Sequence, residues 1–192
     1  FNSKATQPSQ PAITTNAAAL VSEHSPMLGP ANARVHIVEF LDPACETCAT
    51  FFPVVKQMMV DNPDKIRLSI RHVPFHQGSE YVVRLLEASR KQDKYWQTLE
   101  ALLASQAQWA PHHTVQPDLV GPVIAGVGLN SDQLMADMNA PEVGQRMQRD
   151  IDDARTLKVT ATPEYFVNGR PLPSFGLQQL QDLVGEALQQ AD

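Results

Sequence analysis

The chain has 192 residues, of which 43% are hydrophobic and 19% charged, enough to bury a full core as one domain or a domain with an insertion. Its net charge is −6 and it has no basic cluster, which argues against nucleic acid or an anionic membrane surface as a partner. Only two cysteines are present, which favours an oxidising compartment without excluding the cytosol.

The first 25 residues are rich in Ser, Thr, Gln, Asn, Ala and Pro and contain little to bury. We therefore interpret residues 1–25 as a flexible N-terminal leader or tether. A short helix over residues 17–23 is an alternative, as is an end that packs on the domain. The sequence begins with Phe1, and no apolar run approaches the roughly 18 residues of a spanning helix, so we expect a signal peptide or membrane anchor to be missing.

An apolar run over residues 34–41 predicts a strand covered on both faces, and a helical pattern from about Cys45 to Val60 follows it. The two cysteines, Cys45 and Cys48, lie where this strand meets the helix. The N–H groups at a helix start favour a thiolate on Cys45, and Cys48 is placed to attack a mixed disulfide formed there. The pair therefore predicts a reversible redox switch. Half a zinc site and a plain structural disulfide are the alternatives.

Glu39 interrupts the apolar strand six residues before Cys45. Burial would raise the pKa of this carboxyl group, which suits a proton carrier. The alternative is a partly exposed strand glutamate without a catalytic role.

The remaining chain divides into three parts. Residues 65–73 alternate as a second strand, and the order strand, helix, strand implies a parallel crossover, so residues 26–77 form one unit. Residues 78–158 have a wholly helical pattern, which we interpret as an insertion of five helices. Residues 159–192 contain a short strand at 164–167, a hairpin turn at Asn168-Gly169 and a last amphipathic helix from about Gly176.

Several of these features recur together in one known family. Glu39 stands six residues before Cys45 and Pro53 five residues after Cys48; Thr162-Pro163 is followed by Tyr165-Phe166-Val167-Asn168-Gly169; Leu28-Gly29-Pro30 and Ala33-Arg34-Val35 lead into the first strand; and helices separate the two halves. In order and spacing, about residues 26–190 resemble the DsbA-like thiol:disulfide oxidoreductases of the thioredoxin superfamily. The resemblance implies an α/β thioredoxin fold, a mixed central sheet flanked by helices, with an all-helical insertion.

The resemblance also implies roles for individual residues. Cys45 would be the exposed nucleophile and Cys48 the more buried resolving thiol, with Glu39 relaying protons to Cys48. A cis Pro163 would lie against the cysteines, and the Thr162 backbone would pair with an extended substrate chain. The resemblance implies no cofactor beyond the redox-active disulfide, and no metal.

The segment between the cysteines departs from the family pattern. Family oxidases often carry Pro-His there and an aromatic residue just before, whereas this chain has Glu46-Thr47 and Ala44. We expect Glu46 and Thr47 to modulate the pair, because the Glu46 carboxylate repels a thiolate on Cys45 and makes the disulfide a milder oxidant. The direction of electron flow stays open.

Three functions follow from these observations. The first is a periplasmic disulfide donor that acts on unfolded or partly folded cysteine-containing proteins, served by a membrane redox partner. The second is a reductase or isomerase in the same compartment. The third is a copper-handling thiol protein, which would need a ligand beyond the two sulfurs, such as His72, His76, His112 or His113.

Overall fold

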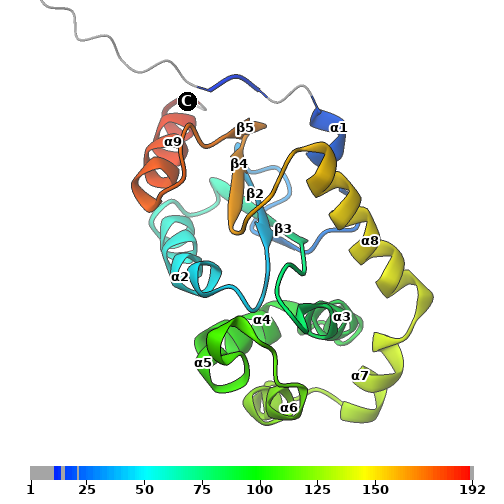
Figure 1. Ribbon diagram of the computed structural model, residues 1–192. Coiled ribbons are helices and arrows are strands. Elements are labelled where there is room, and N and C mark those ends of the chain that lie inside the picture. The colour runs from blue at the N-terminus through cyan, green and yellow to red at the C-terminus, as the bar shows by residue number, and fades with distance from the viewer. Residues whose placement is uncertain (1–10, 14–15, 21, 191–192) are drawn as a thin grey trace, which may run out of the picture.

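The computed structural model describes residues 11–13, 16–20 and 22–190. Among these residues five strands form one sheet in the order β1-β3-β2-β4-β5 (Figure 1). β2 and β3 are parallel and the other neighbouring pairs are antiparallel, which confirms the predicted crossover and the mixed sheet. The strands are β1 Met27–Leu28, β2 Val35–Leu41, β3 Ile66–His72, β4 Glu164–Val167 and β5 Arg170–Pro171.

Helices cover both faces of the sheet, with α2 and α9 on one side and α1 and α8 on the other, while α3 to α7 gather at one end (Figure 1). The α-helices are α1 Ala17–Leu20, α2 Glu46–Asp61, α3 Ser79–Ser89, α4 Tyr95–Ala104, α5 Gln106–Trp109, α6 Val120–Ile124, α7 Ser131–Met138, α8 Pro141–Thr156 and α9 Leu177–Gln190. Four 3₁₀ turns lie among them: η1 Arg90–Gln92, η2 Pro111–His113, η3 Pro117–Leu119 and η4 Ala125–Val127. The fold is thus the predicted thioredoxin fold with a helical insertion.

The central strand β2 contributes to two hydrophobic cores. Ile37 belongs to the larger core, which contains residues of α2, α9 and the insertion, whereas Val38 and Phe40 belong to a smaller core with residues of α1 and α8. Successive side chains of a strand point to opposite faces, so a strand covered on both sides must be apolar throughout. This confirms the interpretation of the apolar run before the cysteines.

One helix of the insertion is shorter than its apolar spacing predicts. Its apolar positions at 120–127 divide between α6 and the 3₁₀ turn η4, and Gly128 at φ +88° ends this stretch. Gly126 and Gly128 lower the helix propensity here, which outweighs the apolar spacing. Within the described part of the chain, no helix is long and apolar enough to span a bilayer.

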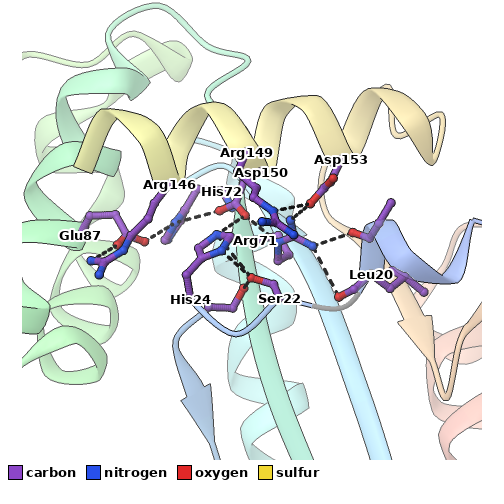
Figure 2. Close-up of polar contacts among 12 residues, drawn as sticks. Leu20, Ser22, His24, Arg71, His72, Glu87, Arg146, Arg149, Asp150 and Asp153 are labelled. Carbon is purple, nitrogen blue, oxygen red and sulfur yellow. Dashed lines mark hydrogen bonds and ion pairs between the residues drawn. The ribbon is translucent and has the colours of Figure 1, made fainter. Parts of the chain in front are cut away.

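The strand β3 carries a buried cation, Arg71, whose burial the sequence did not predict. The Arg71 side chain is fully buried; it donates to Asp150 Oδ1 at 2.6 Å and to the Ala19 carbonyl at 2.8 Å, and it pairs with Asp153 (Figure 2). A buried guanidinium needs such partners, because an unpaired one costs several kcal/mol. The helix α8 supplies both carboxylates, and the N-terminal segment supplies the carbonyl.

The N-terminal segment therefore takes part in the fold over some of the interval that we interpreted as a leader. Ala19 and Leu20 are buried in the smaller core, and His24 bonds to Asp150 at 3.0 Å (Figure 2). Here the packed alternative describes the segment better than a free tether. Residues 1–10, 14–15 and 21, which the same prediction covers, lie outside the described residues.

Candidate active site

The two cysteines lie at the start of α2, directly after the loop that leaves β2. Cys45 is the N-cap residue, with φ −81° and ψ 122°, and its sulfur accepts the Cys48 backbone N–H at 3.3 Å. A cap of this kind leaves the sulfur at the positive end of the helix dipole. The local sequence thus produces the predicted strand–loop–helix arrangement.

The two thiols differ in acidity. A hydrogen bond from the Cys48 side chain lowers the pKa of Cys45 to about 6; burial opposes this, and contacts with Thr162 and the N–H groups of Cys48 and Thr47 add to it. Burial raises the pKa of Cys48 far above its ordinary value, and the neighbouring Cys45 and Glu39 raise it further. At neutral pH only Cys45 therefore carries a thiolate.

Cys45 is less exposed than the resemblance implied. Its exposed fraction is 6%, against 0% for Cys48, and its thiol donates to the Thr162 carbonyl at 3.4 Å. The loop before Pro163 covers part of the sulfur. A reacting partner can therefore approach Cys45 only over a narrow window, while Cys48 is closed to it.

Thr162 is 117 residues from Cys45 in sequence, yet its carbonyl lies 3.4 Å from the Cys45 sulfur, and Pro163 follows it directly. The Thr162–Pro163 peptide bond is cis, and β4 follows it, paired antiparallel to β2. The sheet thus brings the two halves of the chain together at this point. The role of the Thr162 backbone in holding an extended substrate stays a prediction.

Glu39 is buried in the middle of β2. Burial raises its pKa to about 8; the Tyr165 hydroxyl opposes the rise, and the charge of Cys45 adds to it. Neither carboxylate oxygen has a hydrogen-bond partner within the described residues. The pKa is raised in the predicted direction, whereas the role as a proton carrier to Cys48 stays a prediction.

Tyr165 is a residue of this site that the sequence reasoning missed. It lies opposite Glu39 in the β2–β4 register and is fully buried, and its hydroxyl also lacks a hydrogen-bond partner among the described residues. A phenol buried without a partner normally costs free energy. Beside Glu39 this cost can be offset, because the Tyr165 hydroxyl can donate a hydrogen bond to the ionised carboxylate. The available signal was a tyrosine hydroxyl next to the two apolar residues Phe166 and Val167 of the strand.

Asp42 is a second such residue. Its buried carboxylate accepts five hydrogen bonds: at Oδ1 from the Ala44 N–H and the Ser79 hydroxyl, and at Oδ2 from the N–H groups of Phe75 and His76 and from His76 Nδ1. Residues 42–45, here called the active-site loop, are thereby joined to the chain that leads into α3. An aspartate directly after a strand is a common turn residue, which is why its wider role was not recognised.

The two residues between the cysteines, Glu46 and Thr47, make different contacts. Glu46 is exposed, with a side-chain accessibility of 69%, and its carboxylate lies 3.7 Å from His113 Nε2. The backbone N–H of Thr47 contributes to the low pKa of Cys45. The sequence predicted a negative charge at Glu46 beside the Cys45 thiolate, and the structure adds His113 of the insertion next to it.

No group of three or more His, Cys, Asp or Glu side chains arranged to hold a metal ion is found among the described residues. Of the histidines named for the copper hypothesis, His72 bonds to the Tyr95 hydroxyl at 2.8 Å, while His76 bonds to Asp42 at 2.7 Å and His113 lies 3.2 Å from the Ala44 carbonyl.

Comparison with known proteins agrees with this geometry. Residues 21–186 match the family model described as Thioredoxin. The crystal structure of a thioredoxin-like oxidoreductase from Silicibacter pomeroyi DSS-3 is 29% identical, with a TM-score of 0.76 over 92% of this chain and 99% of that one. Disulfide bond formation protein D of Bacillus subtilis is 27% identical over 158 residues, 78% of this chain and 70% of that protein.

A third relative is of a different kind. The Na(+)/H(+) antiporter NhaA of Herminiimonas arsenicoxydans is 31% identical over 144 residues, 75% of this chain but 22% of the antiporter. The chain thus spans about a fifth of the length of the NhaA proteins that it matches. Since the family model covers most of the chain, the chain belongs to the thioredoxin family, and the likeness to a thioredoxin-like oxidoreductase and to a disulfide bond formation protein agrees with the resemblance found in the sequence.

Proposed function

We propose that the chain donates its Cys45–Cys48 disulfide to pairs of cysteines in other proteins. The observation that carries this direction is the contrast between the thiols, because the pKa of Cys45 is lowered to about 6 while that of Cys48 is raised. A stabilised thiolate on Cys45 stabilises the reduced protein relative to the disulfide. A protein whose reduced form is stabilised is an oxidant of its substrates.

The exchange runs through two displacements. A client thiolate attacks Cys45 Sγ, the S–S bond breaks, and Cys48 leaves as a thiolate. A second client thiolate then attacks the client sulfur of the mixed disulfide and displaces Cys45. The client loses two electrons and gains a disulfide, and the protein keeps both electrons as two thiols. Cys45 is a good leaving group in the second step, because its thiolate is stable at neutral pH.

Glu39 is suited to the first displacement. The departing Cys48 thiolate is strongly basic in its buried position and must take up a proton. Glu39, with a pKa raised to about 8, is mostly protonated at neutral pH and lies close enough to raise the pKa of Cys48. We propose that it supplies this proton and regains it when the disulfide forms again.

The same chemistry limits partners and location. Clients are unfolded or partly folded proteins with reduced cysteines, and a membrane redox partner is proposed to take the two electrons from Cys45 and Cys48. A disulfide donor is useful only where thiols are not kept reduced, which favours the bacterial periplasm over the cytosol. The redox-active disulfide is proposed to act without a cofactor.

The direction is tested by the equilibrium with glutathione and by two activity assays. We expect a reduction potential above about −200 mV, more oxidising than glutaredoxins. The oxidised protein should restore activity to reduced, unfolded ribonuclease, and a Cys45→Ala variant should not. Catalysis of insulin reduction together with a potential near the roughly −270 mV of thioredoxin would instead establish the reductase alternative and overturn the donor proposal.

A further inference from the structure

Side chains of the helical insertion are hydrogen-bonded to the backbone of the active-site loop. The Gln106 side chain donates from one nitrogen to the carbonyls of Pro43 and Cys45, both at 2.8 Å, and His113 Nδ1 lies 3.2 Å from the Ala44 carbonyl. The carbonyls of three consecutive residues, Pro43, Ala44 and Cys45, thus accept hydrogen bonds from α5 and η2 of the insertion. The insertion therefore holds the backbone that carries the nucleophile Cys45 in position.

The contacts of His113 fix where its protons must be. A carbonyl can only accept, so the contact with Ala44 places a proton on Nδ1. A neutral ring that donates from Nδ1 has a lone pair at Nε2, and this lone pair would face the Glu46 carboxylate 3.7 Å away. A ring protonated on both nitrogens would present an N–H to the Ala44 carbonyl and a second N–H toward the Glu46 carboxylate.

Other groups around His113 hold the ring in this place. It stacks on His76 with centroids 4.8 Å apart and an interplanar angle of 17°, and His76 Nδ1 bonds to the buried Asp42 carboxylate. His112 and His113 both have positive φ, at 53° and 62°, a conformation that residues other than glycine seldom adopt. The titratable groups that face His113 are therefore Glu46 from α2, His76 from the segment after β3 and, through His76, Asp42.

We propose that His113 is a positioning residue of the exchange reaction, which places a cation beside Glu46 and so offsets the repulsion between that carboxylate and the Cys45 thiolate. This proposal deepens the proposed function, on which it rests, by assigning the regulation of the same site by pH. When His113 is protonated, the thiolate is favoured and the disulfide is the stronger oxidant. When His113 is neutral, Glu46 acts unopposed and the disulfide is a milder oxidant.

The test is a cycle of His113→Gln and Glu46→Gln, singly and together. Glutamine can still donate to the Ala44 carbonyl but carries no charge. The Cys45 pKa is measured from the pH dependence of alkylation, to which Cys48 does not contribute, and the oxidising strength from the glutathione equilibrium. The matched control is His112→Gln, since His112 is exposed, next in sequence and without a hydrogen bond or ion pair to the described residues.

We expect His113→Gln to raise the Cys45 pKa and to make the protein less oxidising by about two- to five-fold in the glutathione equilibrium, the size expected of a partly exposed charge contact. Glu46→Gln should lower the Cys45 pKa by more in the His113→Gln background than in the wild type, and the double variant should return close to the wild type. The effect of His113→Gln on the glutathione equilibrium should vanish at pH values where histidine is neutral, and it should shrink in high salt. The control His112→Gln should change neither the Cys45 pKa nor the glutathione equilibrium.

Two results would overturn the proposal: an equal effect of Glu46→Gln in both backgrounds, or an effect of His113→Gln that does not depend on pH. Neither readout needs a client protein. A chain that fails to oxidise ribonuclease while its Cys45 pKa responds to His113 would therefore refute the proposed function and leave this inference intact.

Discussion

Neutralising Glu39 should stabilise the protein, by an amount that grows with pH. Burial is the main cause that raises the pKa of this carboxyl group from its ordinary 4.5 to about 8. At about 1.4 kcal/mol per pH unit, ionising Glu39 in the folded protein costs about 5 kcal/mol more than in the unfolded chain. Between these two values the folded state binds more protons than the unfolded state, so stability falls as pH rises from 4.5 to about 8 and changes no further above it.

The assay is urea unfolding of the reduced wild type and of Glu39→Gln at several pH values. The two proteins should differ least below pH 4.5, where both side chains are neutral, and the variant should be more stable by up to about 5 kcal/mol at and above about pH 8. Cys45 contributes with the opposite sign, since its folded pKa of about 6 lies below its ordinary 9 and adds stability as pH rises. Because both proteins contain Cys45, most of that contribution cancels in the difference.

Parallel stability curves for the two proteins, with no divergence between pH 5 and 8, would refute the argument that Glu39 is ionised against a desolvation cost. The rate of disulfide exchange is an independent readout. Glu39→Gln should slow the step in which Cys48 takes up or loses a proton, although it leaves the fold more stable. A gain in stability coupled to a loss of rate separates a catalytic group from a merely structural one.

Three further predictions concern the neighbouring residues. Cys48→Ala should accumulate mixed disulfides between Cys45 and client proteins on non-reducing gels while Cys45→Ala traps none, and equal trapping by both would reverse the assignment of nucleophile. Tyr165→Phe should raise the Glu39 pKa, measured by carboxyl NMR titration, because the hydroxyl opposes the rise, and an unchanged pKa would remove Tyr165 from the site. Asp42→Ala should lower the free energy of unfolding by roughly 3–5 kcal/mol, because several buried donors lose their acceptor, and a loss below about 1 kcal/mol would mean that the active-site loop does not depend on this carboxylate.

Local patterns were sufficient for the elements that present the cysteines. The apolar run of β2, the alternation of β3 and the helical spacing of α2 are each set by residues close in sequence, and their periods differ enough to be distinguished. The burial of Glu39 followed from the same pattern, because a carboxyl in a strand covered on both faces has no route to water. The second half of the fold was predicted from the order of its motifs, in which Thr162-Pro163 precedes a strand and a hairpin turn.

Only the tertiary structure decided what surrounds the nucleophile. Gln106 and His113 meet the active-site loop across more than 60 residues of chain, and no period in the sequence marks them. The same holds for Arg71, whose alternating position in β3 is equally compatible with solvent and with the buried ion cluster under α8. Local sequence fixes which way a side chain points along its own element, whereas the charge that it meets depends on which element packs opposite. For this reason the sequence predicted a carboxylate beside Cys45 at Glu46, whereas only the fold shows that His113 lies beside that carboxylate.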